Sequence, residues 1–205
     1  MLFRSERAIN WYQLALREAQ ENQHRIREYL ARSALHGALV ETGAYDQAVA
    51  GLRALIKQVD PDWRILPECY RYLTRAYLGL GNTALALEAA QLALEHAYRT
   101  EEPRELAQAW GILGRVASQT KQPISIYKEG ELILFDASTC FAESLKMFTE
   151  LNLRRNQALV FWYWSQHELA QGDREEGEIM WYKARVIFEE LRLPLYVAKM
   201  KKDLV

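Results

Sequence analysis

The chain has 205 residues, of which 50% are hydrophobic, so it can bury one substantial core. Its 26 basic and 27 acidic residues nearly cancel, which argues against direct binding to nucleic acid through an overall positive charge. Cys69 and Cys140 are too few for a disulfide framework. The sequence contains no run of 18 apolar residues, so no membrane span is predicted.

The N-terminal sequence also bears on location. Arg4, Glu6 and Arg7 follow directly after the first three residues, so the apolar core of a signal peptide is missing. We therefore expect a cytoplasmic protein. Ten glycines and five prolines are few for this length, which favours long helices over a turn-rich β fold.

The first predicted helix belongs to a half repeat over residues 5–22, with Ser5 as its N-cap. Apolar residues recur on one face of this helix: Ala8, Tyr12, Ala15, Leu16 and Ala19. Because this spacing matches the second helix of the pair that follows, the segment is interpreted as half of a helix pair.

The first full repeat covers residues 25–60 and is predicted to contain helices over 25–42 and 45–58. Gly43 separates them, because the residue after a helix often needs a positive φ. The spacing predicts two inner faces, one of Leu35, Ala38, Leu39 and Thr42 and one of Ala48, Leu52 and Leu55. Pro61 lies beyond the second helix and cannot continue it.

The second repeat covers residues 64–99 and breaks at Gly81. Asn82 is predicted to cap its second helix. That helix carries a face of small residues that allows close packing: Ala86, Ala90, Ala93 and Ala97.

The third repeat covers residues 103–150, and Pro103 suits its first helical turn. An insert over 120–135 interrupts it. Apolar residues alternate there on both sides of Gly130, first Ile124 and Ile126, then Leu132 and Leu134. Period two around a glycine predicts a short β-hairpin or an ordered loop that projects from the helices.

The fourth repeat covers residues 153–193, with a break at Gly172 and a helix cap at Asp173. Phe161 and Trp164 fit the core pattern of its first helix. Pro194 opens a terminal helix over 194–204.

Taken together, the repeats resemble the tetratricopeptide-repeat family. Trp110, Leu113 and Gly114 follow its W-x2-L-G pattern, and Ala8–Tyr12 and Ala137–Phe141 follow its A-x3-F/Y pattern. This resemblance implies an all-α fold: a right-handed α-solenoid of antiparallel helix pairs, forming a single domain over 1–205 with one hairpin or loop insert. The breaks at Gly43 and Gly81 lie 38 residues apart, longer than the family's usual 34, so HEAT-like helix pairs are the alternative fold.

A narrower resemblance lies in the phrases FTELNL, LAQGD and FEELRLP. These are similar to repeats that trail bacterial regulatory ATPases, nucleotide-cyclase-like proteins and large transcriptional activators. The resemblance implies a sensor or docking part of a larger bacterial signalling or regulatory protein.

Catalytic, metal and cofactor patterns are not found. His167-Glu168 lacks the second histidine that a zinc-binding helix needs four residues after the first. Cys69 and Cys140 are predicted to be small core residues. We therefore expect a protein that is not an enzyme, although a fold of this kind does not by itself exclude a hydrolase or a transferase.

Three arginines are candidate binding residues. Arg71 and Arg75 lie one turn apart on a first helix, and Arg115 has the place in repeat three that Arg75 has in repeat two. First helices of successive tetratricopeptide repeats line a concave groove, so the resemblance implies that these arginines bind an acidic peptide or a phosphate. Solvated or salt-bridged arginines are the simpler interpretation.

An aromatic run supplies the other candidates. Residues 161–164 are four successive aromatics, which cannot all face one neighbour on a helix. Trp162 is predicted on the groove side as a binding anchor, with Gln166 a turn later. Burial of Trp162 by the last helix or by another subunit is the alternative.

These observations predict a scaffold that binds a protein or peptide, without a membrane segment. The alternative is a regulatory domain that binds a small-molecule effector in the same groove, using the arginines and Trp162. The first helix offers more apolar side chains than one neighbour covers, including Trp11 and Leu14. We therefore expect that this chain is either a segment cut from a longer protein or a homodimer that forms through the terminal helices. In a third interpretation, the first helix folds back and buries both of its faces within one chain.

Overall fold

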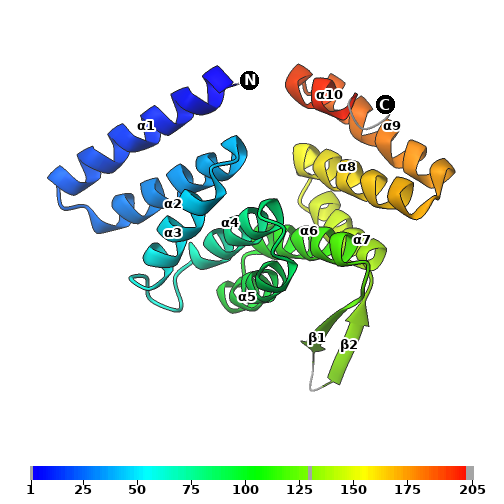
Figure 1. Cartoon of the computed structure of the whole chain (residues 1–205), viewed down its shortest axis with the longest axis horizontal. Coiled ribbons are helices and arrows are strands. Elements are labelled where there is room, and N and C mark those ends of the chain that lie inside the picture. The colour runs from blue at the N-terminus through cyan, green and yellow to red at the C-terminus, as the bar shows by residue number, and fades with distance from the viewer. Residues whose placement is uncertain (1, 129–130, 202–205) are drawn as a thin grey trace. The chain divides into compact units, whose positions relative to one another are not determined.

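The computed structural model describes residues 2–128 and 131–201, with the side chains of 6–126 and 131–201. Its described part contains ten helices and one two-stranded hairpin (Figure 1). The elements are α1 Leu2–Glu21, α2 Arg25–Thr42, α3 Tyr45–Ile56, α4 Leu66–Gly79, α5 Thr83–Thr100, α6 Pro103–Thr120, β1 Ile124–Lys128, β2 Glu131–Phe135, α7 Ala137–Glu150, α8 Arg154–Gln171, α9 Arg174–Glu190 and α10 Pro194–Met200. The prediction of an essentially all-helical chain of packed neighbouring helices is confirmed.

The chain forms two compact units, Met1–Glu102 and Pro103–Val205. Helices that follow one another in sequence pack together within each unit, most extensively α1 with α2 and α4 with α5 in the first, and α6 with α7 and α8 with α9 in the second. The unit boundary coincides with the predicted start of the third repeat. No helix in the described ranges is long and apolar enough to cross a membrane.

Three predicted helix breaks are confirmed by the backbone. Gly43, Gly81 and Gly172 have φ values of 83°, 73° and 90°, which glycine adopts easily because it has no Cβ. The caps predicted at Asn82 and Asp173 are also confirmed. The side chain of Asn82 accepts a hydrogen bond from the Leu85 backbone N–H (3.1 Å).

The cap at the start of α1 was predicted wrongly. The helix begins at Leu2, so Ser5 lies inside it and is not its N-cap. The physical reason is that residues 2–4 contain neither glycine nor proline, and leucine and arginine are good helix formers, so nothing in the sequence stops the helix at Ser5.

The inner face of α2 differs from the predicted one. Leu35 and Leu39 are only half-buried, whereas Ser33 and Gly37 are buried. The structure explains this shift through close contact with α4: a Cβ atom added at Gly37 would lie only 2.5–2.9 Å from the ring of Tyr72. The place where α2 crosses α4 is marked by small residues, which the spacing of large apolar residues does not reveal.

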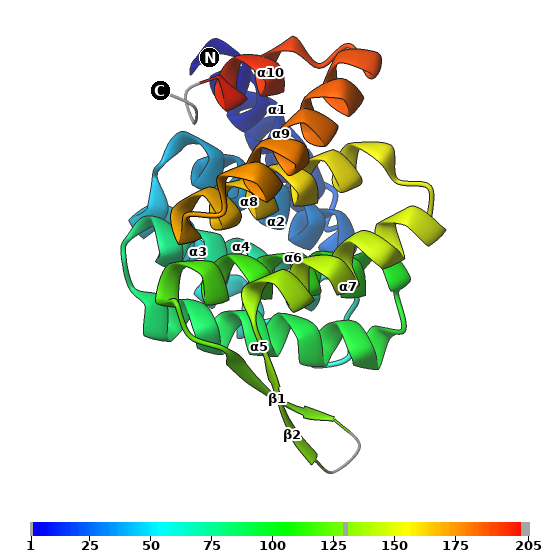
Figure 2. The ribbon, with the colours of Figure 1, turned by 90° about the vertical axis from the view of Figure 1, so that its right-hand side faces the viewer.

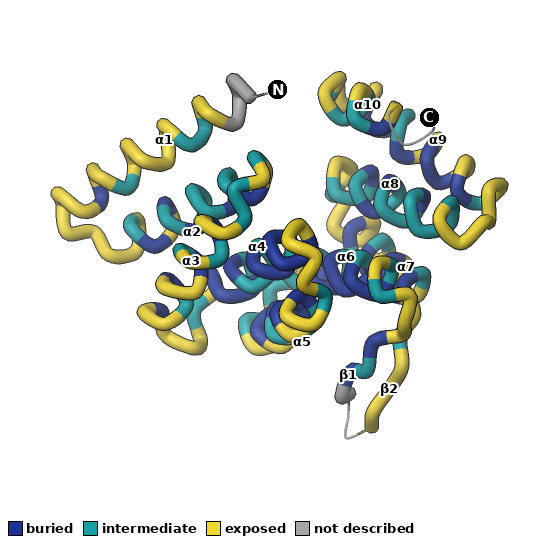
Figure 3. The backbone as a smooth tube through the Cα atoms, in the orientation of Figure 1, coloured by how far each residue is buried: buried dark blue, intermediate teal, exposed yellow. Residues whose placement is uncertain are grey.

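The inner faces predicted for α3 and α5 are confirmed, whereas only Ala19 is buried of the apolar face predicted for α1. Ala48, Leu52 and Leu55 of α3 are completely buried. On α5, the alanine face is buried along its whole length: Ala86, Ala90, Ala93 and Ala97. Figure 3 shows these buried helix faces in dark blue, in contrast to α1, most of which is exposed.

The insert forms the predicted hairpin, which extends away from the adjoining helices α6 and α7 (Figure 2). Its strands pair antiparallel, with Ile124 opposite Phe135. The ring of Phe135 lies 5.0 Å from that of Trp110 on α6, which fastens the base of the hairpin. The turn predicted at Gly130 lies outside the described residues.

Candidate protein-binding surfaces

In the first unit, the predicted binding arginines lie on α4 in ion pairs. An Nη atom of Arg75 lies 2.6 Å from a carboxylate oxygen of Glu41 on α2, and one of Arg71 lies 3.7 Å from Glu68. The side chains of Arg71 and Arg75 are only 16% and 21% exposed. The arginines are thus held in place by acids of the same unit, as the salt-bridged interpretation describes.

Glu68 is itself fixed by two hydroxyl groups. The Ser33 hydroxyl donates to Glu68 Oε2 (3.2 Å), and the Tyr72 hydroxyl donates to Glu68 Oε1 (3.1 Å). Burial, helped by the charge of Glu68, raises the pKa of Tyr72 to about 12, so its phenol stays protonated at neutral pH. An acidic peptide that binds Arg71 or Arg75 therefore has to compete with carboxylates already in place.

The two cysteines are core residues, as predicted. Both are completely buried. Burial raises the pKa of each thiol to about 12, so the reactive thiolate is scarce at neutral pH. Within the described residues no group of three or more histidine, cysteine and acidic side chains is arranged to hold a metal ion.

Arg115 lies in the second unit, on α6. Its guanidinium carbon is 4.3 Å from the centre of the Tyr163 ring on α8, a close cation–π contact. Because Arg71 and Arg75 belong to the first unit, one groove formed by all three arginines stays a prediction. Sequence reasoning missed Tyr163 as the partner of Arg115, since the two residues are far apart in the chain.

Trp162 requires a correction. It is only 7% exposed and belongs to the core formed by α8, α9 and α10, so it is not an accessible anchor. The rings of Phe188 and Tyr196 meet it edge to face, each with centroids 6.4 Å away. The physical reason is cover by α9 and by the last helix, α10; burial by the last helix was one of the alternatives. Gln166, a turn further along, is half-buried.

The residues predicted for the core of α8 are less buried than Trp162. Phe161 and Trp164 are both half-buried. The Trp164 indole N–H donates to Glu168 (2.6 Å), which also accepts from the Ser138 hydroxyl (2.8 Å). Because Trp162 is buried, it is not available as a stacking surface for the small-molecule effector of the alternative prediction.

A hydroxyl–imidazole pair lies nearby that sequence reasoning did not predict. Ser118 Oγ of α6 is 3.1 Å from His167 Nδ1 of α8. Such a pair is the beginning of an activated nucleophile when an acid orients the imidazole. The adjacent acid, Glu168, instead receives its hydrogen bonds from Ser138 and Trp164. We therefore assign no catalytic role to Ser118 and His167.

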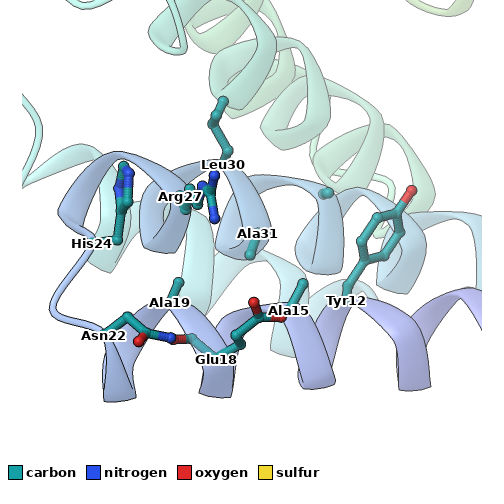
Figure 4. A pocket seen from close by; sticks show the side chains of 10 residues that line it. Tyr12, Ala15, Glu18, Ala19, Asn22, His24, Arg27, Leu30 and Ala31 are labelled. Carbon is teal, nitrogen blue, oxygen red and sulfur yellow. The ribbon is translucent and has the colours of Figure 1, made fainter.

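An open groove of about 460 Å³ lies between α1 and α2 (Figure 4). Alanines leave the space: Ala15, Ala19, Ala31 and Ala34 line it. Tyr12 and Leu30 add apolar walls, while Glu18, His24 and Arg27 form polar edges. Exposed large residues adjoin its lining residues in sequence, namely Trp11 (67%), Leu14 (52%) and Ile26 (53%). The apolar excess predicted for α1 is present, whereas the groove itself was not predicted.

The hairpin carries another exposed apolar surface. On β2, Leu132 and Leu134 are 59% and 62% exposed. They are two residues apart and so point to the same face of the sheet. By contrast, Ile124 and Ile126 of β1 are buried.

No family model matches this sequence, and no curated protein matches it. Among solved structures, the crystal structure of BtubC (BKLC) from P. vanneervenii is similar, with a TM-score of 0.67 and 20% sequence identity. The match covers 98% of this chain and 81% of that chain. At this identity the likeness concerns the fold alone. The chain is thus similar in fold to BtubC over nearly its whole length.

Proposed function

We propose that the chain is a protein-interaction scaffold built from tetratricopeptide-like helix pairs wound as a right-handed solenoid. The glycine breaks, the alanine faces and the packing of successive helices support the repeat assignment. The observation that carries the function is the exposed apolar face of the hairpin. Its strand β2 presents Leu132 and Leu134 to solvent.

The hairpin is suited to binding an extended segment of a partner. In the two-stranded sheet β2 pairs with β1 along one edge only, and the outer edge of such a strand accepts a further strand through backbone hydrogen bonds. Leu132 and Leu134 would supply apolar contact on one face of the added strand. Exposed apolar residues grouped in this way are typical of a surface that contacts another protein.

The test compares capture by the wild-type chain with capture by a Leu132→Ser, Leu134→Ser variant, using an extract of the source organism. A double variant at two other exposed leucines, Leu85→Ser and Leu191→Ser, is the matched control because these residues are 37% and 39% exposed. We expect a defined partner with the wild type and the control, and its loss with the hairpin variant. Identical capture by all three, or no specific capture by any, would reject the proposal.

The biological setting is also a proposal. The similarity of FTELNL, LAQGD and FEELRLP to repeats of bacterial signalling proteins supports a sensor or docking role within a larger regulatory protein. An ATPase, cyclase or DNA-binding domain encoded next to this segment would support that setting. A neighbouring segment of purely metabolic chemistry would contradict it.

A further inference from the structure

One stripe of exposed side chains runs along α1, and its last member, Glu18, also lies at the edge of the groove between α1 and α2. Arg7, Trp11, Leu14 and Glu18 follow at intervals of four, three and four residues, which places them on a single helical face. All four are exposed. Ala19, which lies on a different side of the helix, is buried. The stripe is therefore a surface of α1 that the first unit leaves uncovered.

The order of residues in this stripe is self-complementary. From its N-terminal end it reads basic, aromatic, aliphatic and acidic. When a second copy of the helix runs in the opposite direction, Arg7 comes opposite Glu18 and Trp11 comes opposite Leu14. Both pairs share one midpoint, between Tyr12 and Gln13, so one twofold axis satisfies both.

We propose that two copies of this chain associate through α1, with the two helices antiparallel and related by a twofold axis near Tyr12 and Gln13. The paired residues are Trp11 with Leu14 in the centre and Arg7 with Glu18 at each end. This inference does not depend on the hairpin and goes beyond the proposed function, because it names a different surface and its occupant.

The groove between α1 and α2 gives the indole a place to enter. In the antiparallel pair, Trp11 of one copy lies level with Leu14 of the other, next to Ala15. Ala15 lines the groove, with Tyr12 and Leu30 as further walls (Figure 4). Its volume of about 460 Å³ leaves room for an aromatic side chain. The alanine lining thus supplies the cavity that the large residue fills.

Charge complementarity favours a second copy over an unrelated helix. Among the described contacts, neither Arg7 nor Glu18 forms an ion pair with another residue of its own chain. An unrelated amphipathic helix needs only apolar residues to fill the groove. The mirrored order of base and acid around Trp11 and Leu14 is required only when the partner is the same helix.

The first experiment measures mass by sedimentation over a range of concentrations. We expect the wild type to move toward twice 23.9 kDa as concentration rises, and Trp11→Glu to stay monomeric. Tyr182→Glu is the matched control, because Tyr182 is an equally exposed aromatic (63%) on α9. The control should dimerise as the wild type does. A wild-type monomer at every concentration, or a dimer unaffected by Trp11→Glu, would overturn the proposal.

The second experiment tests the antiparallel register by exchanging charges. Arg7→Glu alone sets two acids against each other at both ends of the stripe, and Glu18→Arg alone sets two bases against each other. Each variant should dimerise at least tenfold more weakly than the wild type. An equimolar mixture of the two variants should regain dimers, because each copy then offers the charges that the other lacks.

The mixture also separates this arrangement from other interfaces. Recovery of heterodimers, together with dimers of the doubly exchanged Arg7→Glu, Glu18→Arg chain, supports the twofold pairing. Failure of the mixture to regain dimers would overturn the register, even where Trp11→Glu abolishes association. Circular dichroism of each variant confirms that the helices are intact, since all four stripe residues are exposed and their replacement removes no core contact.

Discussion

Two tryptophans on two helices have opposite surroundings. Trp11 of α1 is 67% exposed, whereas Trp162 of α8 is 7% exposed. Both stand beside other aromatic residues in the sequence, and both were candidates for contact with a partner. The difference is that α9 and α10 pack over α8, whereas among the described elements of the first unit α1 packs chiefly against α2 and leaves Trp11 exposed. An aromatic residue in a helical repeat is therefore a core residue or a contact residue according to what packs beside it.

The largest expected effect separates the two tryptophans by stability. Trp162→Ala should lower the free energy of unfolding by about 3–5 kcal/mol, because it leaves a cavity among Phe188 and Tyr196. Trp11→Ala is the matched change at an exposed site and should alter it by less than about 0.5 kcal/mol in the monomer. Urea unfolding at low protein concentration measures both. Equal losses would break the comparison.

A second prediction removes part of the cover and keeps Trp162 in place. Tyr196 of α10 stacks on Phe188 with centroids 4.7 Å apart and also contacts Trp162. Tyr196→Ala should cost about 2–4 kcal/mol and give Trp162 more contact with water. Tryptophan fluorescence should then shift to longer wavelength. The shift should be absent when the same change is made in a Trp162→Phe background, which assigns it to Trp162. An unshifted spectrum would show that α9 alone covers the indole.

A third prediction concerns the hairpin, where Ile124 and Ile126 of β1 are buried while Leu132 and Leu134 of β2 are exposed. Replacing Gln122–Leu132 by a short linker should leave the helical content nearly unchanged, and Phe135 keeps its contact with Trp110. The deletion removes the buried side chains of Ile124 and Ile126, whose burial stabilises the fold by about 1.5–3 kcal/mol each. It also removes the entropy cost of ordering the insert, which offsets this loss. We expect a small shift of the unfolding midpoint. Loss of cooperative unfolding would place the insert in the core.

A smaller stability effect than that of the three core and hairpin changes is expected at Arg75. Charge reversal by Arg75→Glu breaks a partly exposed ion pair with Glu41, worth about 0.2–1 kcal/mol, and also sets two carboxylates against each other. If the α4 arginines bind an acidic segment, the variant should also bind a fluorescent glutamate-rich peptide more weakly, with a reduced salt dependence. Arg174→Glu is the control, since Arg174 also forms an exposed ion pair. Equal peptide binding by all three chains would reject the acidic-partner site.

Much of the fold was predictable because it depends on local signals. Gly43, Gly81 and Gly172 end helices through their own backbone freedom, and Asn82 and Asp173 cap helices through their own side chains. The hairpin was predictable from alternation around a glycine. These signals act within a few residues, so they do not require knowledge of the neighbours in space.

The candidate site was less predictable because it depends on pairs that are distant in the chain. Arg75 meets Glu41, and Arg115 meets Tyr163. Each pair joins two helices, and helical spacing places a residue on a face without saying what lies opposite. The same limit explains Gly37, whose burial follows from the ring of Tyr72 on α4 rather than from any pattern in α2.

The sequence by itself determined the helix breaks at Gly43, Gly81 and Gly172, which segment leaves the helical pattern, and that the alanine face of α5 is buried. The tertiary structure alone decided that Trp162 is covered, that Arg71 and Arg75 are held by acids, and that a groove lies between α1 and α2. The physical reason is range. Helix ends depend on backbone and side-chain groups a few residues apart, whereas burial and ion pairing depend on which surfaces meet after the helices have packed.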